Sequence, residues 1–133
     1  MFLFDTNILI ELSRPRPRPE VLRRFVNVTL GEGTTSAVVL MELRQGTART
    51  VRPQASWVSL ADSILKRLTI LDFTPKDALA AADIDAALER RGRTVPEIDL
   101  MIGATALNHG LTMVTRNVKD FADIPGLKIE NWF

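Results

Sequence analysis

The chain opens with MFLFDTNILI (residues 1–10), in which the polar triplet Asp5-Thr6-Asn7 separates two apolar runs. The run at 2–5 is short, continuous and apolar, which is typical of a buried strand that ends at Asp5. Asp, Thr and Asn are all favourable helix N-caps, so a capped strand-to-helix junction explains the triplet by itself. A ligand site is the alternative, because open parallel sheets bind ligands beyond the carboxyl ends of their strands.

The rest of the chain alternates short apolar strands with helices. Strands are predicted at 2–5, 34–38, 69–73, 111–115 and 127–130. Helices are predicted at 6–13, at 20–28, from the second strand to about Gly46, from Pro53 to about Leu68, from Pro75 to near Gly92 and at 96–109, with a helical turn at 117–122. Local signals mark several ends: RPRPRP (14–19) ends the first helix, Thr74 caps the fifth and Gly110 stops the sixth. This alternation predicts an α/β domain of three layers, α/β/α, around a central, mainly parallel sheet of four or five strands.

Length and composition limit the kinds of protein that this chain can be. Its 133 residues, 46% hydrophobic and 25% charged, suit one globular domain spanning 1–133. The absence of cysteine excludes disulfides and thiolate sites, and the single histidine, His109, excludes a multi-histidine metal centre. The N-terminal apolar run contains Asp5 and lacks a basic leader and the length of a membrane span, so we expect a cytoplasmic protein with no membrane association.

Glu42 is the second carboxylate in unexpected surroundings, since it lies within the apolar segment SAVVLMELRQG (36–46). It either marks the solvent face of that helix, where Arg44 or Arg49 would pair with it, or faces the same edge of the sheet as Asp5.

Asp99 is the third such carboxylate, and it lies in the first turn of the helix predicted at 96–109. The helix dipole alone would favour an anion there. Asp99 also shares one helical face with Gly103 and Ala106, at i, i+4 and i+7 spacing. Small residues on this face would let the helix approach the sheet closely and point the carboxylate toward the strand ends, whereas Glu97 can face water.

The segment TRNVKDF (115–121) follows the fourth predicted strand and places Asp120 near another strand end. Asp120 either belongs to a surface turn, capping it or pairing with Lys119 or Arg116, or joins the other carboxylates. Three or four carboxylates at one edge would raise one another's pKa unless a cation neutralised them. Oxygen ligands without histidine or cysteine favour Mg²⁺ or Mn²⁺, and such a site activates water for attack on a phosphodiester.

Arginines cluster after the first helix although the net charge is only +1. The planar fork of arginine suits phosphate recognition, and an arginine-rich solvated surface is the alternative. Polyproline II geometry in the RPRPRP run would splay these side chains around the axis, so only some of them can address one partner. The cluster comprises Arg14, Arg16, Arg18, Arg23 and Arg24.

The order of these motifs resembles the PIN-domain family, and specifically the VapC toxins of bacterial toxin–antitoxin pairs. The segments that carry the resemblance are FDTNILIE (4–11), TSAVVLMELRQG (35–46), IDLMIGATALNHGLTMVTRNVKDF (98–121) and IPGLKIENW (124–132). The resemblance implies a PIN-like fold and an Mg²⁺ or Mn²⁺ site on Asp5, Glu42 and Asp99. Some relatives carry Asp at the position of Asn117, so either Asp120 substitutes for it or Asn117 is a neutral ligand.

The resemblance also implies a function, an endoribonuclease that cuts structured RNA, often tRNA. It implies a homodimer that a VapB-type antitoxin silences in a hetero-oligomer. Asp5 and Asp99 would be the central ligands, with Glu42 completing the site or orienting water. The supporting residues would be Thr6 and Thr115, which hold carboxylates, and Asn7, which caps the first helix while positioning Asp5. The candidate RNA contacts are Arg116, Arg14, Arg16 and Arg18.

Two other functions compete with this interpretation. A phosphotransferase with Asp5 as nucleophile would need an Asp at position 7 and a positioned lysine, but position 7 is Asn and no lysine precedes Lys66. A catalytically weak PIN-like binding module would act only by binding antitoxin or RNA. The retention of Asp5, Glu42 and Asp99 argues against such a module, and Asn117 argues for it.

Overall fold

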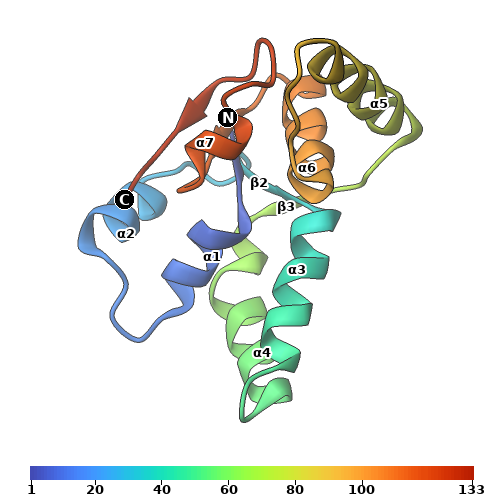
Figure 1. The fold of residues 1–133 in the computed structure, drawn as a ribbon. Helices are drawn as coiled ribbons and strands as arrows, with labels where there is room; N and C mark the ends of the chain where they lie inside the picture. Colours follow the sequence, from blue (N-terminus) through green and yellow to red (C-terminus); the bar gives the residue numbers. More distant parts are fainter.

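A computed structural model describes all residues, 1–133, and its five strands form one sheet (Figure 1). The strands are β1 (Phe2–Phe4), β2 (Gly33–Ser36), β3 (Thr69–Leu71), β4 (Thr112–Val114) and β5 (Ile129–Glu130). Their order is β3-β2-β1-β4-β5, and every neighbouring pair is parallel. In the register of the three central strands, Leu3 lies opposite Thr34 on one side and Met113 on the other. The predicted parallel sheet is confirmed, with five strands.

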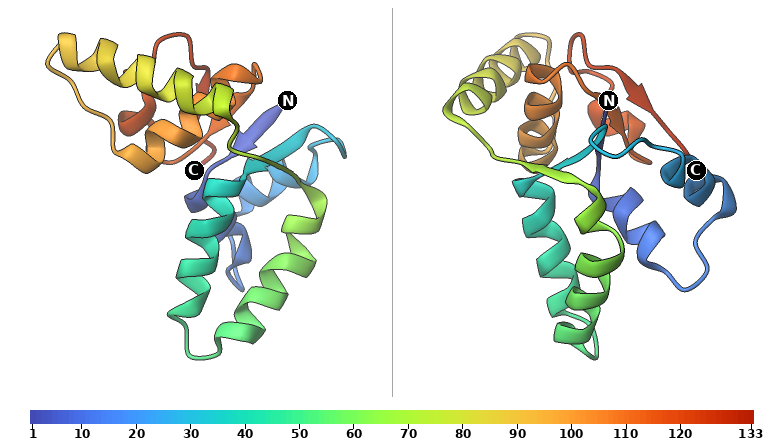
Figure 2. Two further views of the ribbon diagram at one scale, coloured as in Figure 1. Left: turned by 90° about the vertical axis from the view of Figure 1, so that its right-hand side faces the viewer. Right: turned by 180° about the vertical axis from the view of Figure 1, so that it is seen from behind.

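Helices cover both faces of this sheet. They are α1 (Thr6–Ser13), α2 (Pro19–Val26), α3 (Ala37–Ala48), α4 (Pro53–Ser63), α5 (Pro75–Arg90), α6 (Glu97–Asn108) and α7 (Val118–Phe121), with a 3₁₀ turn η1 (Leu65–Arg67). Right-handed crossovers place α1 to α4 on one face and α5 to α7 on the other, because the chain reverses its direction across the sheet after β3. Figures 1 and 2 show α3 and α4 projecting together from one side and α5 and α6 on the other. None of these helices is both long and apolar enough to cross a membrane.

Two of the predicted helix ends are confirmed in atomic detail. The Thr74 hydroxyl accepts the Asp77 N–H and the Asp77 carboxylate accepts the Thr74 N–H, both at 3.2 Å, so a capping box starts α5. After α6, Gly110 adopts φ +64°, and the Leu111 N–H donates to the Ala106 carbonyl at 2.9 Å. This is the Schellman motif that a glycine after the last helical residue favours.

Several predicted boundaries are wrong: α2 ends at Val26, β3 ends at Leu71 and β5 begins at Ile129, each two residues from its prediction. Two further boundaries differ for a local reason. The second strand ends at Ser36 instead of Val38, because the Ser36 hydroxyl accepts the Val39 N–H at 3.1 Å and so caps α3. The helix from Pro53 ends at Ser63 instead of continuing to Leu68. Ile64 adopts φ −120° and ψ −56°, outside the helical region, so the α-helix ends before it and the 3₁₀ turn η1 follows.

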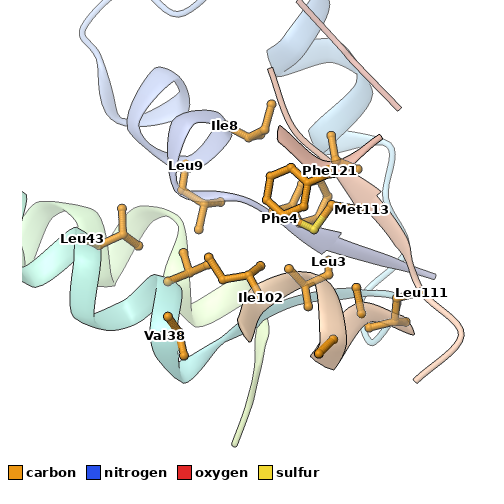
Figure 3. Packing of buried hydrophobic residues seen from close by; sticks show 14 of the residues in the cluster. Leu3, Phe4, Ile8, Leu9, Val38, Leu43, Ile102, Leu111, Met113 and Phe121 are labelled. Carbon is orange, nitrogen blue, oxygen red and sulfur yellow. The ribbon is translucent and has the colours of Figure 1, made fainter. Parts of the chain in front are cut away.

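The hydrophobic core holds β1 between the two helical layers. Leu3 and Phe4 are fully buried, and Figure 3 shows apolar side chains of β1, α1, α3 and α6 converging there. The Phe4 ring packs edge-on against Phe25 of α2 and against Trp132, with both pairs of ring centroids 5.3 Å apart. Because β1, β2 and β4 are parallel, their carboxyl ends meet at one edge, and this rigid core fixes the residues that follow them.

Candidate active site

Asp5 lies at the carboxyl end of β1, and its side chain is only 3% exposed. One carboxylate oxygen, Oδ1, accepts the Thr6 N–H at 2.8 Å and so caps α1. The other, Oδ2, accepts the Thr115 hydroxyl at 2.8 Å and the Asn7 amide at 3.1 Å. Burial raises the pKa of Asp5, and the charge of Glu42 adds to this rise although the three hydrogen bonds oppose it.

Asn7 connects the start of α1 to the loop after β4. Its amide donates to Asp5 and also to the Thr115 hydroxyl at 3.3 Å, and its carbonyl oxygen accepts the Arg116 N–H at 3.0 Å. The prediction that Asn7 caps the first helix is wrong, because Asp5 occupies the cap position and Asn7 already lies within the helix. Asn7 instead holds two chain segments together around the Asp5 carboxylate.

Glu42 faces α1 and not an arginine. Its Oε1 accepts the Thr6 hydroxyl at 2.6 Å, and the side chain is half-buried. The pairing considered above with Arg44 or Arg49 does not form, since the four ion pairs of the structure all involve other residues. The charge of Glu42 reaches both Asp5 and Asp99, so the carboxylate lies within the acidic group at the sheet edge.

Asp99 and Asp120 approach this group from the opposite helical layer. Burial raises the pKa of the half-buried Asp99 to about 6, with further contributions from the charges of Asp5, Asp120 and Glu42 and from a hydrogen bond with Asp120. Glu97 is exposed, as its position on the other face of α6 predicts. Four carboxylates, at the end of β1 and on α3, α6 and α7, are thus close enough for the charges of three of them to act on the fourth, Asp99.

The small residues beside Asp99 serve a different contact from the one predicted. A Cβ on Gly103 would lie 2.5 Å from the Ile124 side chain and 3.5 Å from Phe121. At Gly103 the close approach is therefore between α6 and the α7 region instead of the strands. This contact brings the helix that carries Asp120 against the helix that carries Asp99.

Asn117 lies at the rim of the site. Its backbone N–H donates to the Thr115 hydroxyl at 3.0 Å, while its exposed side chain makes no hydrogen bond. Asp120, one helical turn further on, is the side chain that interacts with Asp99.

The chemistry of this donor set fits a hard divalent cation. All the side chains are oxygen donors, no histidine lies among them, and no lysine or arginine pairs with any of the four carboxylates. No three acidic or histidine side chains are close enough to enclose an ion as they stand, so the cage is not preformed. Small side-chain movements toward a common cation would relieve the repulsion among the carboxylates, which adds to the effect of burial on the pKa of Asp99.

The candidate RNA-contact arginines lie in different environments. Arg14 pairs with Glu11 at 2.9 Å, and the exposed Arg16 makes no side-chain hydrogen bond or ion pair. The guanidinium groups of Arg18 and Arg116 both lie over the ring of Phe133, 5.2 and 4.8 Å from its centroid.

Two residues that support these arginines were missed at the sequence level. Glu11, only 3% exposed, also accepts the Arg18 N–H at 2.8 Å. Its place three residues after Ile8 on the buried face of α1 was a signal that could have found it. Phe133 gave no comparable signal, because its contacts come from residues far away in the sequence.

Fold and site together define a class: a small α/β domain with an acidic site at the carboxyl edge of a five-stranded parallel sheet. The PIN domain family matches residues 2–127. Over 98% of this chain and 97% of each relative, the sequence is 35% identical to "Ribonuclease VapC2" of Haemophilus influenzae and 33% identical to "tRNA(fMet)-specific endonuclease VapC" of Salmonella typhimurium. The chain belongs to the PIN-domain family, and within it to the VapC-type ribonuclease toxins of VapBC toxin–antitoxin systems.

Solved structures of the family agree with this assignment. VapBC2 from Rickettsia felis, bound to a DNA fragment from its promoter, matches with a TM-score of 0.90 and 28% identity, over 99% of this chain and 98% of that chain. DNA-bound VapBC from Salmonella typhimurium matches with a TM-score of 0.89 and 32% identity, over 99% and 98%. The agreement covers the complete sheet and its helices.

Proposed function

We propose that this ribonuclease depends on Mg²⁺ or Mn²⁺ and cleaves structured RNA, with tRNA as its substrate class. The observation that supports metal dependence is the convergence of four carboxylates, from four different elements, without any basic partner. The names of two relatives, each a tRNA(fMet)-specific endonuclease at 33% and 34% identity, support tRNA.

In this proposal each side chain has a distinct role. Asp5 and Asp99 hold the ion, which when bound activates a water molecule and stabilises charge on the phosphodiester. Thr115 fixes the orientation of Asp5 through its 2.8 Å hydrogen bond. Thr6 holds Glu42 at 2.6 Å, in position to complete the site or to orient the attacking water.

Asp120 is the fourth acidic member of the site in this proposal. Its contact with Asp99 favours it over Asn117, whose side chain is exposed. The proposed ligands thus come from both helical layers. They come together only when the whole domain is folded.

Cleavage of bulk tRNA by the purified chain, freed of any antitoxin, tests the proposal. We expect cleavage with Mg²⁺ or Mn²⁺, none in EDTA, and none by Asp5→Asn, because an amide lacks the charge that binds the ion. Asp83→Asn, an exposed position on α5, is the matched control and should cleave like the parent. Full activity in EDTA would exclude the metal mechanism, and inactivity on the whole tRNA pool would favour the catalytically weak binding module.

We further propose that a VapB-type antitoxin neutralises this chain and that the toxin forms a homodimer within a hetero-oligomer. Structures of complexes among the neighbours, including VapBC2 of Rickettsia felis and FitAcB of Neisseria gonorrhoeae, support the pairing with an antitoxin. Addition of the cognate antitoxin should abolish tRNA cleavage at a fixed toxin-to-antitoxin ratio. Undiminished cleavage in the assembled complex would contradict the proposal.

A further inference from the structure

An aromatic ring lies beside the acidic site at the same edge of the sheet. β4 and β5 are parallel, so the residues after β5 leave the sheet at the edge where Asp5 lies. Phe133 is among them, and the guanidinium of Arg116 lies 4.8 Å from its ring centroid. Arg116 directly follows Thr115, whose hydroxyl binds Asp5. The ring and its cation are therefore anchored at the rim of the proposed active site.

Arg18 reaches the same ring from a different part of the chain. Its guanidinium lies 5.2 Å from the Phe133 centroid, and its backbone N–H donates to the buried Glu11 at 2.8 Å. Arg116 is held in a matching way, since its N–H donates to Asn7 at 3.0 Å. Each arginine is thus fixed at its backbone by a hydrogen bond and at its side chain by the ring. The ring of Phe133 is itself half-buried and packs against the hydrophobic core.

Stacking on a ring leaves the hydrogen-bonding capacity of a guanidinium intact. The contact uses the face of the group, whereas its five N–H donors lie in its plane. Neither Arg18 nor Arg116 has an ion-pair partner or a side-chain hydrogen bond. Four other arginines do pair with carboxylates: Arg14, Arg23, Arg24 and Arg93. Arg18 and Arg116 therefore carry free donors that are already ordered.

We propose that Arg18 and Arg116 form a phosphate clamp for the RNA strand next to the cleaved bond, and that Phe133 is the positioning residue that orders it. The inference rests on the proposed ribonuclease function, which puts a phosphodiester at the carboxylates. Planar forks with free donors suit the oxygens of a phosphate. No basic residue pairs with the four carboxylates, so they would repel the negative backbone of RNA. The two arginines of the clamp place positive charge beside them, which lets the backbone approach.

Equilibrium binding of labelled bulk tRNA, measured in an Asp5→Asn background to prevent cleavage, tests the clamp. Phe133→Leu should weaken binding about fivefold, because two ring–guanidinium contacts are lost, and Phe133→Trp should restore it. Arg18→Ala with Arg116→Ala should make the slope of log affinity against log salt shallower by about 1.4 to 1.8, for two lost phosphate contacts. Arg91→Ala, an exposed arginine on the loop after α5, is the control and should leave binding almost unchanged.

A double-mutant cycle separates positioning from direct stacking. If Phe133 acts through the arginines, Phe133→Leu should have no further effect when Arg18 and Arg116 are both alanine. If Phe133→Leu weakens tRNA binding equally with and without the two arginines, Phe133 does not act by positioning them. If the arginine double variant binds tRNA as tightly as the parent, the clamp is overturned. That result is also the one expected if the two arginines bind an acidic protein instead of RNA. The arginine variant reads out the clamp directly even if Phe133→Leu lowers the stability of the fold.

The same measurements distinguish failure of the clamp from failure of the proposed function. Clamp variants that bind tRNA like the parent, in a protein that cleaves tRNA with Mg²⁺, would overturn the clamp alone. Clamp-dependent binding in a protein that never cleaves tRNA would support the clamp and contradict only the nuclease mechanism. Absence of any tRNA binding by the Asp5→Asn parent would overturn the clamp, while cleavage of tRNA by the unmodified chain would still support the proposed function.

Discussion

The two oxygens of the Asp5 carboxylate have different partners, which resolves the competition between capping and ligand binding. Oδ1 accepts the first N–H of α1, whereas Oδ2 accepts the side chains of Thr115 and Asn7. An ionised carboxylate offers about four acceptor positions, so three bonds leave room for one more partner. A helix cap and the proposed ion site are therefore compatible in one residue, and the cap would hold the carboxylate in place for an ion.

At the residue scale, Thr115→Val tests how much the orientation of Asp5 matters. The change keeps the shape of the fully buried side chain but removes the hydroxyl that donates to Asp5 at 2.8 Å. We expect the free energy of unfolding to fall by about 2 kcal/mol and tRNA cleavage to fall about 10- to 100-fold. Urea unfolding and initial cleavage rates measure these losses. Thr112→Val, on the same strand without a side-chain hydrogen bond, is the control, and equal losses in both variants would contradict the role of the hydroxyl.

Sequence reasoning could find some residues of the site and not others. Asp5 and Glu42 were identifiable because each is a charged side chain beside or within an apolar segment, and Asp99 because it shares a helical face with Gly103 and Ala106. Glu11 could have been found in the same way, from its position on the buried stripe of α1. Phe133 could not, since its role depends on two arginines brought beside it by the closed sheet.

At the element scale, helix ends with local causes were predictable and those with distant causes were not. Thr74 and Gly110 act through bonds within a few residues, so their signals are visible in the sequence. At Ile64, where α4 ends, the backbone leaves the helical conformation and the side chain is buried in the core, and no local signal in the sequence marks this position. The contact of Gly103 with Ile124 also depends on tertiary packing, and helical spacing alone assigned it to the wrong neighbour.

The packing of α5 on α6 depends on the buried carboxylate of Asp77, which is 1% exposed. Burial disfavours its charge, but hydrogen bonds from Asn108, Thr74 and Thr105 outweigh this and lower the pKa of Asp77. Asp77→Ala should therefore cost about 3 kcal/mol of unfolding free energy at pH 7, from the lost carboxylate half of the capping box and the lost bonds from Asn108 and Thr105, of which Thr105 keeps its bond to the Met101 carbonyl.

The loss in Asp77→Ala should shrink as the pH falls below the ordinary pKa of an aspartate, because the depressed pKa stabilises the fold only while the carboxylate is charged. Urea titrations at pH 7 and in acid measure this difference. Asp83→Ala, exposed on the same helix, is the control. A cost for Asp77→Ala that is equal at both pH values would contradict the assignment.

Gly103→Ala tests how tightly α6 packs against the α7 region, which carries Asp120. Gly103→Ala places a Cβ 2.5 Å from Ile124 Cδ1, so Ile124 must move. Overpacking should outweigh the better helix propensity of alanine and leave a net cost of about 1 kcal/mol. Ile124→Val removes the clashing atom, so the double variant should be less destabilised than the sum of the single changes. Additive costs in urea unfolding would show that the two positions do not interact.

At the scale of the whole molecule, repulsion among the carboxylates of the acidic site lowers the free energy of unfolding. The sheet and both helical layers are needed to bring Asp5, Glu42, Asp99 and Asp120 together, and their mutual repulsion is a cost that appears only on folding. A cation bound at the site would offset that cost, since a ligand that binds only the folded state stabilises it. Stability, pH and divalent metal should therefore be linked.

This linkage gives a prediction with a definite sign. The raised pKa of Asp99, about 6, means that at pH 5 the folded protein binds a proton that the unfolded chain does not. Without metal, the contribution of Asp99 to the free energy of unfolding should therefore fall as the pH rises from 5 to 7. The expected fall is about 1 kcal/mol, because Asp99 is only half-buried and solvent screens the repulsion.

The difference between the parent and Asp99→Asn isolates this group from all others that titrate, since asparagine carries no charge at either pH. Urea unfolding in EDTA at pH 5 and pH 7 should show the parent losing stability relative to the variant, and saturating Mg²⁺ at pH 7 should restore the parent but not Asp99→Asn. A parent that gains stability over the variant between pH 5 and 7 in EDTA would contradict repulsion at the site. An Mg²⁺ effect of equal size in both proteins would place the ion elsewhere on the molecule.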